Sequence, residues 1–275
     1  MRRACVIGWP LAHSRSPVIH RFWLRELGIE GDYVAVPVEP PKIGTFLAEF
    51  PRSGFVGANV TIPHKQAAFA AVAEADPVAR ATGAVNTLWL DSGRLMGANT
   101  DAEGFIASLD EQAPGWDRVG GGALILGAGG AARAIAWGLR NRGMEVTVAN
   151  RTPARADELA AHLGTGVTAG RWSDIPALLA GSRLLVNATP LGLPGHPALD
   201  IDLAPLASDA IVVDIVYVPL KTPLLAAAEA RGLKTVDGLG MLLHQAVPGF
   251  ERWFGKRPRV TPALRAAVIA DLDAH

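Results

Sequence analysis

A strand, a glycine-rich turn and a helix in the middle of the sequence constrain its fold more than any other segment. The apolar run 124–126 leads into Gly127-Ala128-Gly129-Gly130-Ala131-Ala132, and helical spacing follows over 131–142. This is the G-x-G-x-x-A form of the dinucleotide-binding fingerprint. Gly127 permits the tight turn, and Gly129 lets the backbone approach a pyrophosphate at the helix N-terminus. For the motif alone, a tight turn without a ligand and a methyltransferase loop remain alternatives.

The chain after about residue 104 alternates strands and helices regularly. Strands are predicted at 123–126, 145–149, 184–186 and 211–213, and a helix at 153–163. Short apolar strands separated by helices are typical of buried parallel sheets. We therefore predict a doubly wound, Rossmann-type domain over 102–237.

A smaller α/β domain is predicted for residues 1–101. Its expected elements are strands at 4–8, 33–38 and 55–60, helices at 16–27 and 63–75, and a hairpin at 88–96. Two more helices, 241–254 and 262–271, come after the parallel sheet is complete. We expect them to return to the first domain, so that residues 238–275 complete it.

The end of the strand 145–149 indicates which dinucleotide is bound. A site that prefers NAD usually has an Asp or Glu about 20 residues after the glycine turn, on the ribose 2′-hydroxyl. Here the strand ends in Asn150-Arg151-Thr152, and Arg155 follows. Guanidinium groups pair with phosphate, so the segment predicts a 2′-phosphate pocket and hence NADP. The alternative is a solvated helix start with Thr152 as N-cap and ordinary surface arginines.

Four polar clusters of the first domain lie at strand ends or in the turns after them. They are His13-Ser14-Arg15-Ser16-Pro17, Asn59-Val60-Thr61-Ile62-Pro63-His64-Lys65, Gly83-Ala84-Val85-Asn86-Thr87 and Asn99-Thr100-Asp101. Taken singly, Ser16 is expected to cap the helix that Pro17 begins, Asp101 could cap the next helix, and Lys65 could be a surface lysine. Together they offer an acid/base group, a carboxylate, hydroxyls and amides at strand carboxyl ends, where ligands of such sheets bind. This set suits a small polyhydroxylated acid.

Charge and cysteine content exclude several classes. Lys plus Arg and Asp plus Glu are both 26, which disfavours nucleic acid and acidic membranes as partners. Cys5 is the single cysteine, so an internal disulfide framework is excluded and a reducing compartment, the cytoplasm, is expected. The longest uncharged run, 184–199, is too short and too rich in proline to span a membrane.

The ordered motifs resemble those of the shikimate dehydrogenase family, NADP-dependent enzymes of aromatic amino-acid biosynthesis that reduce 3-dehydroshikimate to shikimate. Besides the four clusters and both cofactor segments, they include Asn187-Ala188-Thr189-Pro190-Leu191-Gly192, Asp214-x-x-Tyr217-x-Pro219 and Asp237-Gly238-Leu239-Gly240-Met241-Leu242 leading to Gln245. The resemblance covers essentially the whole chain. Ala12 departs from it, because the family often has Ser before the His.

The resemblance implies a role for each polar group. Ser14 and Ser16 are similar to the pair that binds the substrate carboxylate, Tyr217 lies near it, and Thr61, Asn86 and Gln245 resemble the groups that hold the ring hydroxyls. Lys65 and Asp101 resemble the catalytic dyad, and the nicotinamide is expected between the domains near Ile215 and Gly238. Family members occur as monomers and homodimers.

The implied reaction places a charge requirement on the lysine. Hydride addition to the C3 carbonyl leaves negative charge on oxygen, which a protonated Lys65 stabilises and neutralises, while Asp101 favours and orients the ammonium. No metal is expected. The rivals are a broader quinate/shikimate dehydrogenase, which is often NAD-dependent, and a non-catalytic NADP-binding sensor on the same scaffold. The sensor is disfavoured because it has no need of the dyad.

Overall fold

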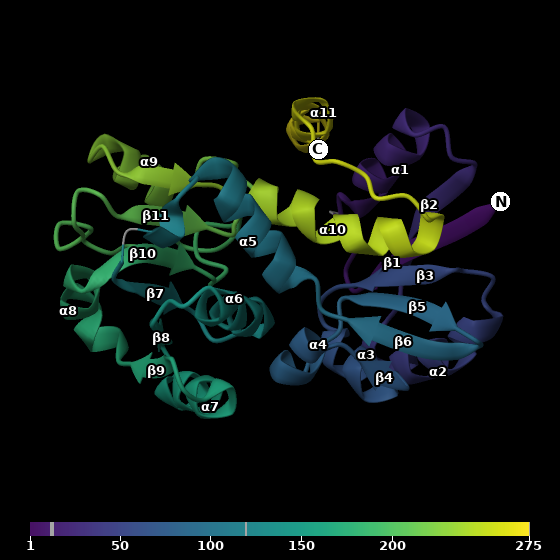
Figure 1. The fold of residues 1–275 in the computed structure, drawn as a ribbon, viewed down its shortest axis with the longest axis horizontal. Helices are drawn as coiled ribbons and strands as arrows, with labels where there is room; N and C mark the ends of the chain where they lie inside the picture. Colours follow the sequence, from purple (N-terminus) through teal and green to yellow (C-terminus); the bar gives the residue numbers. More distant parts are fainter. Residues whose placement is uncertain (12–13, 119, 275) are drawn as a thin grey trace. The chain divides into compact units, whose positions relative to one another are not determined.

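The computed structural model describes residues 1–11, 14–118 and 120–274 of the chain, which form two compact units (Figure 1). The first unit joins residues 1–100 to the C-terminal segment that starts at Leu243, and the second runs from Asp101 to Leu242. The C-terminal helices thus return to the first unit from Leu243 onwards, whereas residues 238–242, which were predicted to belong to it, lie in the second. Each unit is built around its own sheet.

The second unit contains a doubly wound sheet, as predicted. Within the described residues its strand order is β12-β11-β10-β7-β8-β9, and every adjacent pair is parallel. Counted from β7, this is the order 3-2-1-4-5-6 of dinucleotide-binding folds, with its switch point between β7 and β10. The strands are β7 (Gly122–Leu126), β8 (Val146–Ala149), β9 (Val167–Gly170), β10 (Ser182–Asn187), β11 (Ile211–Asp214) and β12 (Lys234–Val236).

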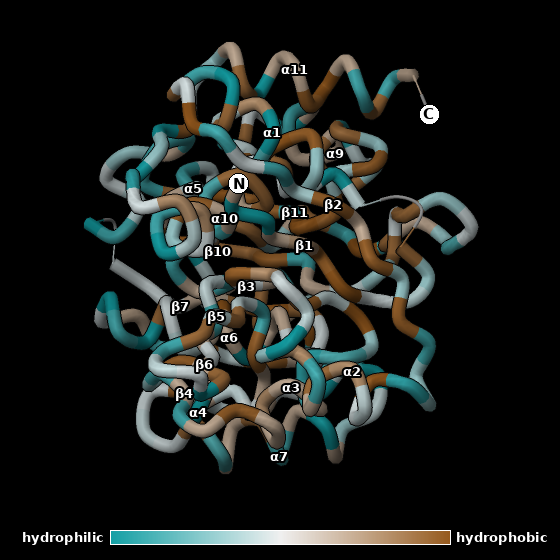
Figure 2. The backbone as a smooth tube through the Cα atoms, turned by 90° about the vertical axis from the view of Figure 1, so that its right-hand side faces the viewer, coloured by the Kyte–Doolittle hydropathy of each residue, from teal (hydrophilic) through white to brown (hydrophobic). Residues whose placement is uncertain are grey.

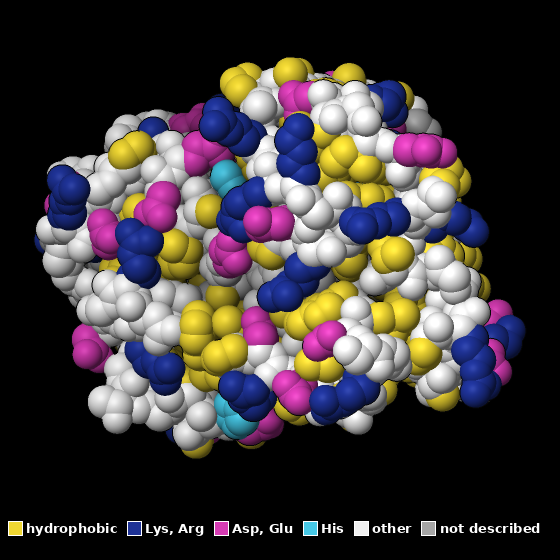
Figure 3. Space-filling view, turned by 45° about the vertical axis from the view of Figure 1, so that its right-hand side comes forward, with side chains coloured by type: hydrophobic (Ala, Val, Ile, Leu, Met, Phe, Trp, Pro, Cys, Tyr) yellow, Lys and Arg dark blue, Asp and Glu magenta, His cyan; other side chains and the backbone are white. Residues whose placement is uncertain are grey.

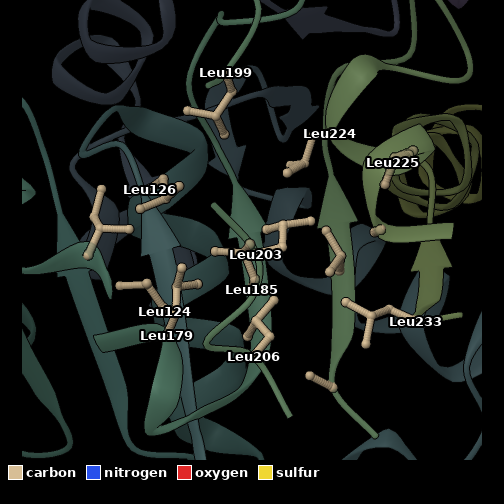
Figure 4. Close-up of a cluster of buried hydrophobic side chains, with 14 of the residues drawn as sticks. Leu124, Leu126, Leu179, Leu185, Leu199, Leu203, Leu206, Leu224, Leu225 and Leu233 are labelled. Atoms are coloured by element: carbon tan, nitrogen blue, oxygen red, sulfur yellow. The ribbon is translucent and has the colours of Figure 1, made fainter. Parts of the chain in front are cut away.

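Helices bury the two faces of the sheet and form most of the connections between its strands, whereas a loop leads from β10 to β11. The helices are α5 (Asp101–Gln112), α6 (Gly130–Asn141), α7 (Pro153–Leu163), α8 (Ile175–Ala180) and α9 (Pro223–Ala230). On one face, leucines of β7, β10, α8 and α9 converge with Leu199, Leu203 and Leu206 of a loop (Figure 4). This core fixes the strand ends from which the loops of the candidate site emerge.

The first unit has a mixed sheet with a switch point of its own. Within the described part of the chain the order is β2-β1-β3-β5-β6-β4, where β1 pairs in parallel with both β2 and β3. The chain runs from β1 to β2 on one side and then crosses to β3 on the other, so the switch point lies between β1 and β3. The strands are β1 (Arg2–Gly8), β2 (Gly31–Pro37), β3 (Gly57–Val60), β4 (Glu74–Ala75), β5 (Thr87–Asp91) and β6 (Arg94–Ala98).

Helices lie on both faces of this sheet (Figure 1). They are α1 (Ser16–Glu26), α2 (Ile43–Glu49), α3 (Lys65–Ala71), α4 (Pro77–Thr82), α11 (Pro262–Asp273) and the part of α10 (Gly238–Phe254) that belongs to this unit. The central strand β1 is largely apolar and buried, as its brown colour in Figure 2 shows. Trp23 of α1 donates a hydrogen bond from Nε1 to the carbonyl of Arg259 over 2.9 Å, which ties α1 to the segment before α11.

Two local predictions are wrong. The helix predicted over 63–75 ends at Ala71, because the next residues pair with β6: the Ala73 N–H donates to Leu95 O over 2.7 Å and the Asp76 N–H to Gly97 O over 3.0 Å. Ser16 is the first residue of α1 rather than its N-cap; the N-cap position is Arg15, and Pro17 follows inside the first turn.

The surface carries charges of both signs. On the face shown in Figure 3, Lys and Arg side chains are interspersed with Asp and Glu, with apolar side chains between them. None of the helices in the described ranges has the length and hydropathy needed to cross a membrane.

Candidate active site

The glycine turn after β7 is held tightly against the loop after β10. Gly127 has φ +108°, and a Cβ added there would lie 2.8 Å from the carbonyl oxygen of Ala188. Its N–H donates to Ala149 O over 2.8 Å. A side chain at this position would therefore be strained and would also push the two loops apart. The turn lies at the switch point of the second unit, where ligands of such sheets bind.

The N-terminus of α6 fits a dinucleotide pyrophosphate. Gly129 and Gly130 are exposed, and a Cβ on either would point into open space. The first N–H groups of a helix have no partner inside it, and the helix dipole favours an anion there. The predicted residues Gly127, Ala128, Gly129, Gly130 and Ala131 thus form a continuous turn and helix start with room for an anionic ligand.

The segment after β8 presents cations and leaves them accessible. Arg151, Thr152 and Arg155 are exposed, and Asn150 donates from Nδ2 to Thr152 O over 2.9 Å. Thr152 stands at the N-cap of α7, but among the described residues its side chain makes no capping hydrogen bond. Its hydroxyl and the two guanidiniums are therefore available to a 2′-phosphate, and this donor set fits NADP.

The ends of β10 and β11 are fixed by a buried carboxylate. Asp214 accepts from Asn187 Nδ2 over 2.9 Å, from the Val216 N–H over 3.0 Å and from the Thr222 hydroxyl over 2.7 Å. Burial raises the pKa of Asp214, while these hydrogen bonds lower it. The network sets the course of the loop that starts at Ile215 and carries the half-buried Tyr217.

The two residues expected near the nicotinamide lie together in the second unit. Gly238, the first residue of α10, lies so close to the backbone of Ile215 that a Cβ there would collide with the Ile215 carbonyl. Asp237 accepts from the N–H of Leu239 over 3.0 Å, which holds the start of α10. The predicted pair therefore forms one small surface next to the end of β11.

In the first unit, the segment from Thr61 to Lys65 leaves the switch point between β1 and β3. The Thr61 N–H donates to Ile7 O over 2.9 Å, and the Trp9 N–H donates to Ile62 O over 3.0 Å. His64 is buried and lies 2.6 Å from the carbonyl of Val38 through Nε2. Lys65 then begins α3 with a half-buried side chain. The two backbone hydrogen bonds and the contact of His64 therefore fix the position from which Lys65 starts.

Asn86 and Gln245 meet through their side chains, although 159 residues separate them. Asn86 Nδ2 donates to Gln245 Oε1 over 3.1 Å, and Asn86 Oδ1 accepts from the N–H of Thr100 over 2.9 Å. The Thr100 hydroxyl donates to Gln245 O over 2.8 Å. This network links β5, the end of β6 and α10 into one wall of amides and hydroxyls. The Val85 N–H donates to Lys65 O over 2.9 Å, which joins Lys65 to the same wall.

The remaining predicted residues lie on neighbouring segments. Ser14 and Ser16 are half-buried at the start of α1, and His13 lies outside the described residues. Asp101 follows Thr100 directly, is 3% exposed and begins α5, so it counts with the second unit while Lys65 belongs to the first. The structure thus brings Thr61, Lys65, Asn86 and Gln245 together in one unit.

Sequence reasoning missed two buried residues that meet at Asn59. Tyr33 and His20 are fully buried, stack with ring centroids 4.0 Å apart, and both contact Asn59 Oδ1. No local pattern marks them, because they come from β2 and α1 and meet only in the folded chain.

Each unit has a switch point that carries polar groups. The one in the second unit has a glycine turn suited to a dinucleotide, and the one in the first unit has Lys65 beside amide and hydroxyl groups. This combination is typical of a two-domain α/β protein of the dinucleotide-dependent oxidoreductase class. Family models agree along most of the chain. The shikimate dehydrogenase substrate binding domain matches residues 6–88, the shikimate/quinate 5-dehydrogenase model matches 117–217, and the shikimate 5′-dehydrogenase C-terminal domain matches 238–268. The chain belongs to the shikimate dehydrogenase family, as predicted.

Individual relatives match over the full length. A protein named shikimate dehydrogenase (NADP(+)) from Azorhizobium caulinodans is 57% identical over 100% of this chain and 98% of its own. One of the same name from Methylocella silvestris is 58% identical over 98% and 97%. The crystal structure of the Thermus thermophilus shikimate 5-dehydrogenase with NADP(H) and shikimate has a TM-score of 0.88 and 41% identity over 98% of this chain and 99% of that one.

The same fold also serves another named activity. A quinate dehydrogenase from Corynebacterium glutamicum in complex with NAD has a TM-score of 0.89 and 32% identity over 98% of this chain and 99% of that one. The fold alone therefore does not select the substrate or the cofactor.

Proposed function

We propose that this chain catalyses the reversible NADPH-dependent reduction of 3-dehydroshikimate to shikimate, with Lys65 and Asp101 as its catalytic pair. Full-length identity of 57–58% to proteins named shikimate dehydrogenase (NADP(+)) carries the proposal. At the level of the family, the predicted activity and cofactor are confirmed by these relatives and by the 41% identical enzyme solved with NADP(H) and shikimate. The place of this reaction is aromatic amino-acid biosynthesis.

The first unit takes the substrate in this proposal. The wall that joins Asn86 and Gln245 offers amide donors and acceptors of the kind that a ring with several hydroxyls needs. Thr61 adds a hydroxyl beside it at the end of β3. Ser14 and Ser16 bind the carboxylate. Neutral hydroxyls hold an anion less strongly than a guanidinium does, so the product leaves readily.

Lys65 moves the proton of the reaction. NADPH, when bound, supplies the hydride that converts the ketone at C3 into an alkoxide. The Lys65 ammonium stabilises the charge that develops on that oxygen and donates a proton to it. Asp101 favours the charged ammonium and orients it. In the reverse direction a neutral Lys65 accepts the proton from the C3 hydroxyl.

The second unit holds the cofactor. The turn Gly127–Ala131 receives the pyrophosphate at the start of α6, and Asn150, Arg151, Thr152 and Arg155 receive the 2′-phosphate. The surface formed by Ile215 and Gly238 receives the nicotinamide. The absence of a carboxylate at the end of β8, where residues 149–155 are all described, supports NADP over NAD.

Absorbance at the nicotinamide band tests the proposal directly. Shikimate with NADP should give rapid reduction of the cofactor, and quinate with NAD should give little. The opposite preference would assign the chain to the quinate-type activity, and no turnover with either pair would favour the non-catalytic sensor. The cytoplasmic location and the assembly as a monomer or homodimer stay predictions.

A further inference from the structure

Three buried polar side chains meet in the second unit where β10 and β11 end. Asp214 is the last residue of β11 and is 1% exposed, and Asn187, its partner in the sheet register, is the last residue of β10 and fully buried. Thr222, the N-cap of α9, is also fully buried. None of the three is among the residues that the proposed function assigns to the cofactor or the substrate.

Asn187 links the loop after β10 to the carboxylate of Asp214. Its Oδ1 accepts from the N–H of Thr189 over 3.0 Å, which identifies the oxygen of this amide. Its Nδ2 donates to Asp214 Oδ1 over 2.9 Å and to Leu191 O over 3.1 Å. Both ends of the amide are therefore engaged, and the loop that follows is held at two points.

The same loop packs against the glycine turn. The Ala188 N–H donates to Leu126 O over 2.8 Å, and a Cβ added to Gly127 would lie 2.8 Å from the carbonyl oxygen of Ala188. Since Asn187 directly precedes Ala188, its position determines where this loop meets the turn that the proposed function assigns to the pyrophosphate.

Asp214 fixes the backbone of the surface assigned to the nicotinamide. The Val216 N–H donates to Asp214 Oδ1 over 3.0 Å, and the Ile215 N–H donates to Asn187 O over 3.1 Å. Gly238 lies so close to Ile215 that a Cβ there would collide with the Ile215 carbonyl. A shift of this backbone would therefore move the whole surface that Ile215 and Gly238 form.

Thr222 holds the other oxygen of the carboxylate. Its hydroxyl donates to Asp214 Oδ2 over 2.7 Å and accepts from the Leu225 N–H over 3.3 Å. Within the described residues, the groups that hydrogen-bond to Asp214 side-chain oxygens are all donors, which suits an ionised carboxylate. Hydrogen bonds to an ionised acceptor are stronger than neutral ones. Removal of the Thr222 hydroxyl should therefore loosen Asp214.

From these contacts we propose that Asp214 is a positioning residue for NADP, which with Asn187 and Thr222 fixes the nicotinamide surface relative to the glycine turn. The proposal rests on the proposed function, because it takes the turn as the pyrophosphate site and Ile215 with Gly238 as the nicotinamide site. A dinucleotide is held at both places at once, so their spacing decides how well the nicotinamide is placed once the rest of the cofactor is bound. Asp214 acts through the backbone and through Asn187.

The Thr222→Val variant tests this role with little change of shape, because it removes the hydrogen bond to Asp214 Oδ2. Two ligands are compared by isothermal titration calorimetry: NADPH, and 2′-phospho-ADP-ribose, which lacks the nicotinamide. Loss of one hydrogen bond should raise Kd for NADPH about fivefold, whereas Kd for the analogue should stay within about twofold of the parent. The rate of shikimate oxidation per site titrated by the analogue should fall by about the same factor as NADPH affinity, or more.

Asp214→Asn removes the same hydrogen bond from its other side. The amide oxygen can keep Asn187 and Val216 as donors, but the NH₂ group replaces the oxygen that accepts from Thr222. This variant should therefore also weaken NADPH and spare the analogue. Thr222→Ser keeps the hydroxyl and should restore most of the NADPH affinity and most of the rate.

Thr261→Val is the matched control for the helix cap that Thr222→Val also loses. Thr261 caps α11 in the first unit, where its side chain accepts from the Leu264 N–H over 3.2 Å. The control should lower thermal stability and leave both dissociation constants unchanged.

Equal weakening of NADPH and the analogue in Thr222→Val would reduce the network to a general structural role and overturn the proposal. Unchanged NADPH binding in both Thr222→Val and Asp214→Asn would overturn it as well, as would an equal loss of NADPH affinity in Thr261→Val. A parent protein that binds both ligands but does not oxidise shikimate would overturn the proposed function alone, because the two dissociation constants require no turnover.

Discussion

Arg15 and Asp271 form an ion pair across 256 positions of the chain, with Arg15 Nη1 2.8 Å from Asp271 Oδ2 and only 10% of the arginine side chain exposed. The pair joins α11 to the residue between Ser14 and Ser16. It also withdraws a guanidinium from the region where two hydroxyls are proposed to bind the substrate carboxylate. The C-terminal helix thus contributes to the substrate domain without carrying a proposed ligand of its own.

Replacement of Asp271 by Asn should destabilise the chain, because the mostly buried guanidinium loses its counter-charge. We expect a loss of about 2 kcal/mol, below the full cost for a deeply buried pair because Asp271 is partly exposed. Urea denaturation followed by circular dichroism measures the loss. The control is Glu251→Gln, which removes the carboxylate that lies 2.7 Å from the exposed Arg257 and should change stability by less than about 0.5 kcal/mol. Equal effects in the two variants would show that the Arg15 pair contributes no more than a surface pair.

Substitution of either serine should weaken substrate binding with little effect on turnover. A hydrogen bond to a carboxylate contributes about 1.5–3 kcal/mol, so Ser14→Ala and Ser16→Ala should each raise KM for shikimate about tenfold or more. The contact exists in the ground state and the transition state alike, so kcat should change little. Since the Ser16 side chain does not cap α1, its loss should not carry a capping penalty. Ser53→Ala, which removes a hydroxyl bound to Phe50 O, serves as control. An unchanged KM in both serine variants would rule out the carboxylate assignment.

Removal of a guanidinium after β8 should change cofactor preference. Arg151→Ala loses one charge-assisted contact to the 2′-phosphate, worth about 1.5–3 kcal/mol, and should raise KM for NADP roughly tenfold or more. KM for NAD, which lacks the phosphate, should barely change. Arg183→Ala is the control. This arginine lies near the N-terminal end of β10, whereas the proposed cofactor segments follow the C-terminal ends of the strands, and it pairs with Asp209 at 3.2 Å. Equal losses for both cofactors in Arg151→Ala would show that this loop does not read the 2′-phosphate.

Much of the fold was predictable because the local signals agree with the tertiary structure. The glycine turn after β7 and the helix 153–163 combine strong periodicity with start and stop residues, and the hairpin at 88–96 carries its own turn chemistry. The helix predicted over 63–75 was too long because an alanine-rich sequence cannot reveal that Ala73 and Asp76 pair with β6. Tertiary pairing overrides helix propensity there.

The candidate site was predictable to the extent that its residues lie in local motifs. Thr61 and Lys65 stand at a strand end, and Asn86 follows a recognisable turn. The link from Asn86 to Gln245 and the link from Tyr33 to Asn59 join segments that are far apart in the sequence, so no single segment encodes them. The resemblance to a family implied which residues bind the ligands, whereas the contacts between these distant segments became visible only in the structure.

Buried His20 should make stability sensitive to acid. Its pKa falls from 6.5 to about 3 in the folded chain because burial disfavours the charged ring. The unfolded chain therefore binds a proton below pH 6.5 that the folded chain does not, so stability is fully present above 6.5 and falls as pH drops towards 3. Between pH 6.5 and 4.5 this group alone should lower the free energy of unfolding by about 2–3 kcal/mol.

Urea denaturation at the two pH values measures this change. In His20→Gln, which does not titrate at this position, that part of the pH dependence should be missing. Identical slopes in parent and variant would contradict a neutral His20. Because the difference in slope is compared, the carboxylates that titrate in both proteins cancel.

Loss of the Lys65 amine should abolish most of the turnover and leave cofactor binding intact. If the ammonium donates its proton in the transition state, Lys65→Ala should lower kcat at least about 10²-fold. The dissociation constant of NADP, measured by fluorescence titration, should stay unchanged because Lys65 belongs to the first unit and the glycine turn to the second. Lys42→Ala is the matched control, since that lysine is exposed and pairs with Glu39 at 2.9 Å, and its kcat should equal that of the parent. Added primary amines of small size should restore part of the activity of Lys65→Ala, because they supply the missing proton donor.

A Lys65→Ala enzyme with near-normal kcat would end the assignment of Lys65 as proton donor. Lost turnover together with lost NADP affinity would instead point to a general structural defect. Lost turnover with intact NADP binding and partial rescue by amines is the pattern that separates an enzyme from a sensor on the same fold.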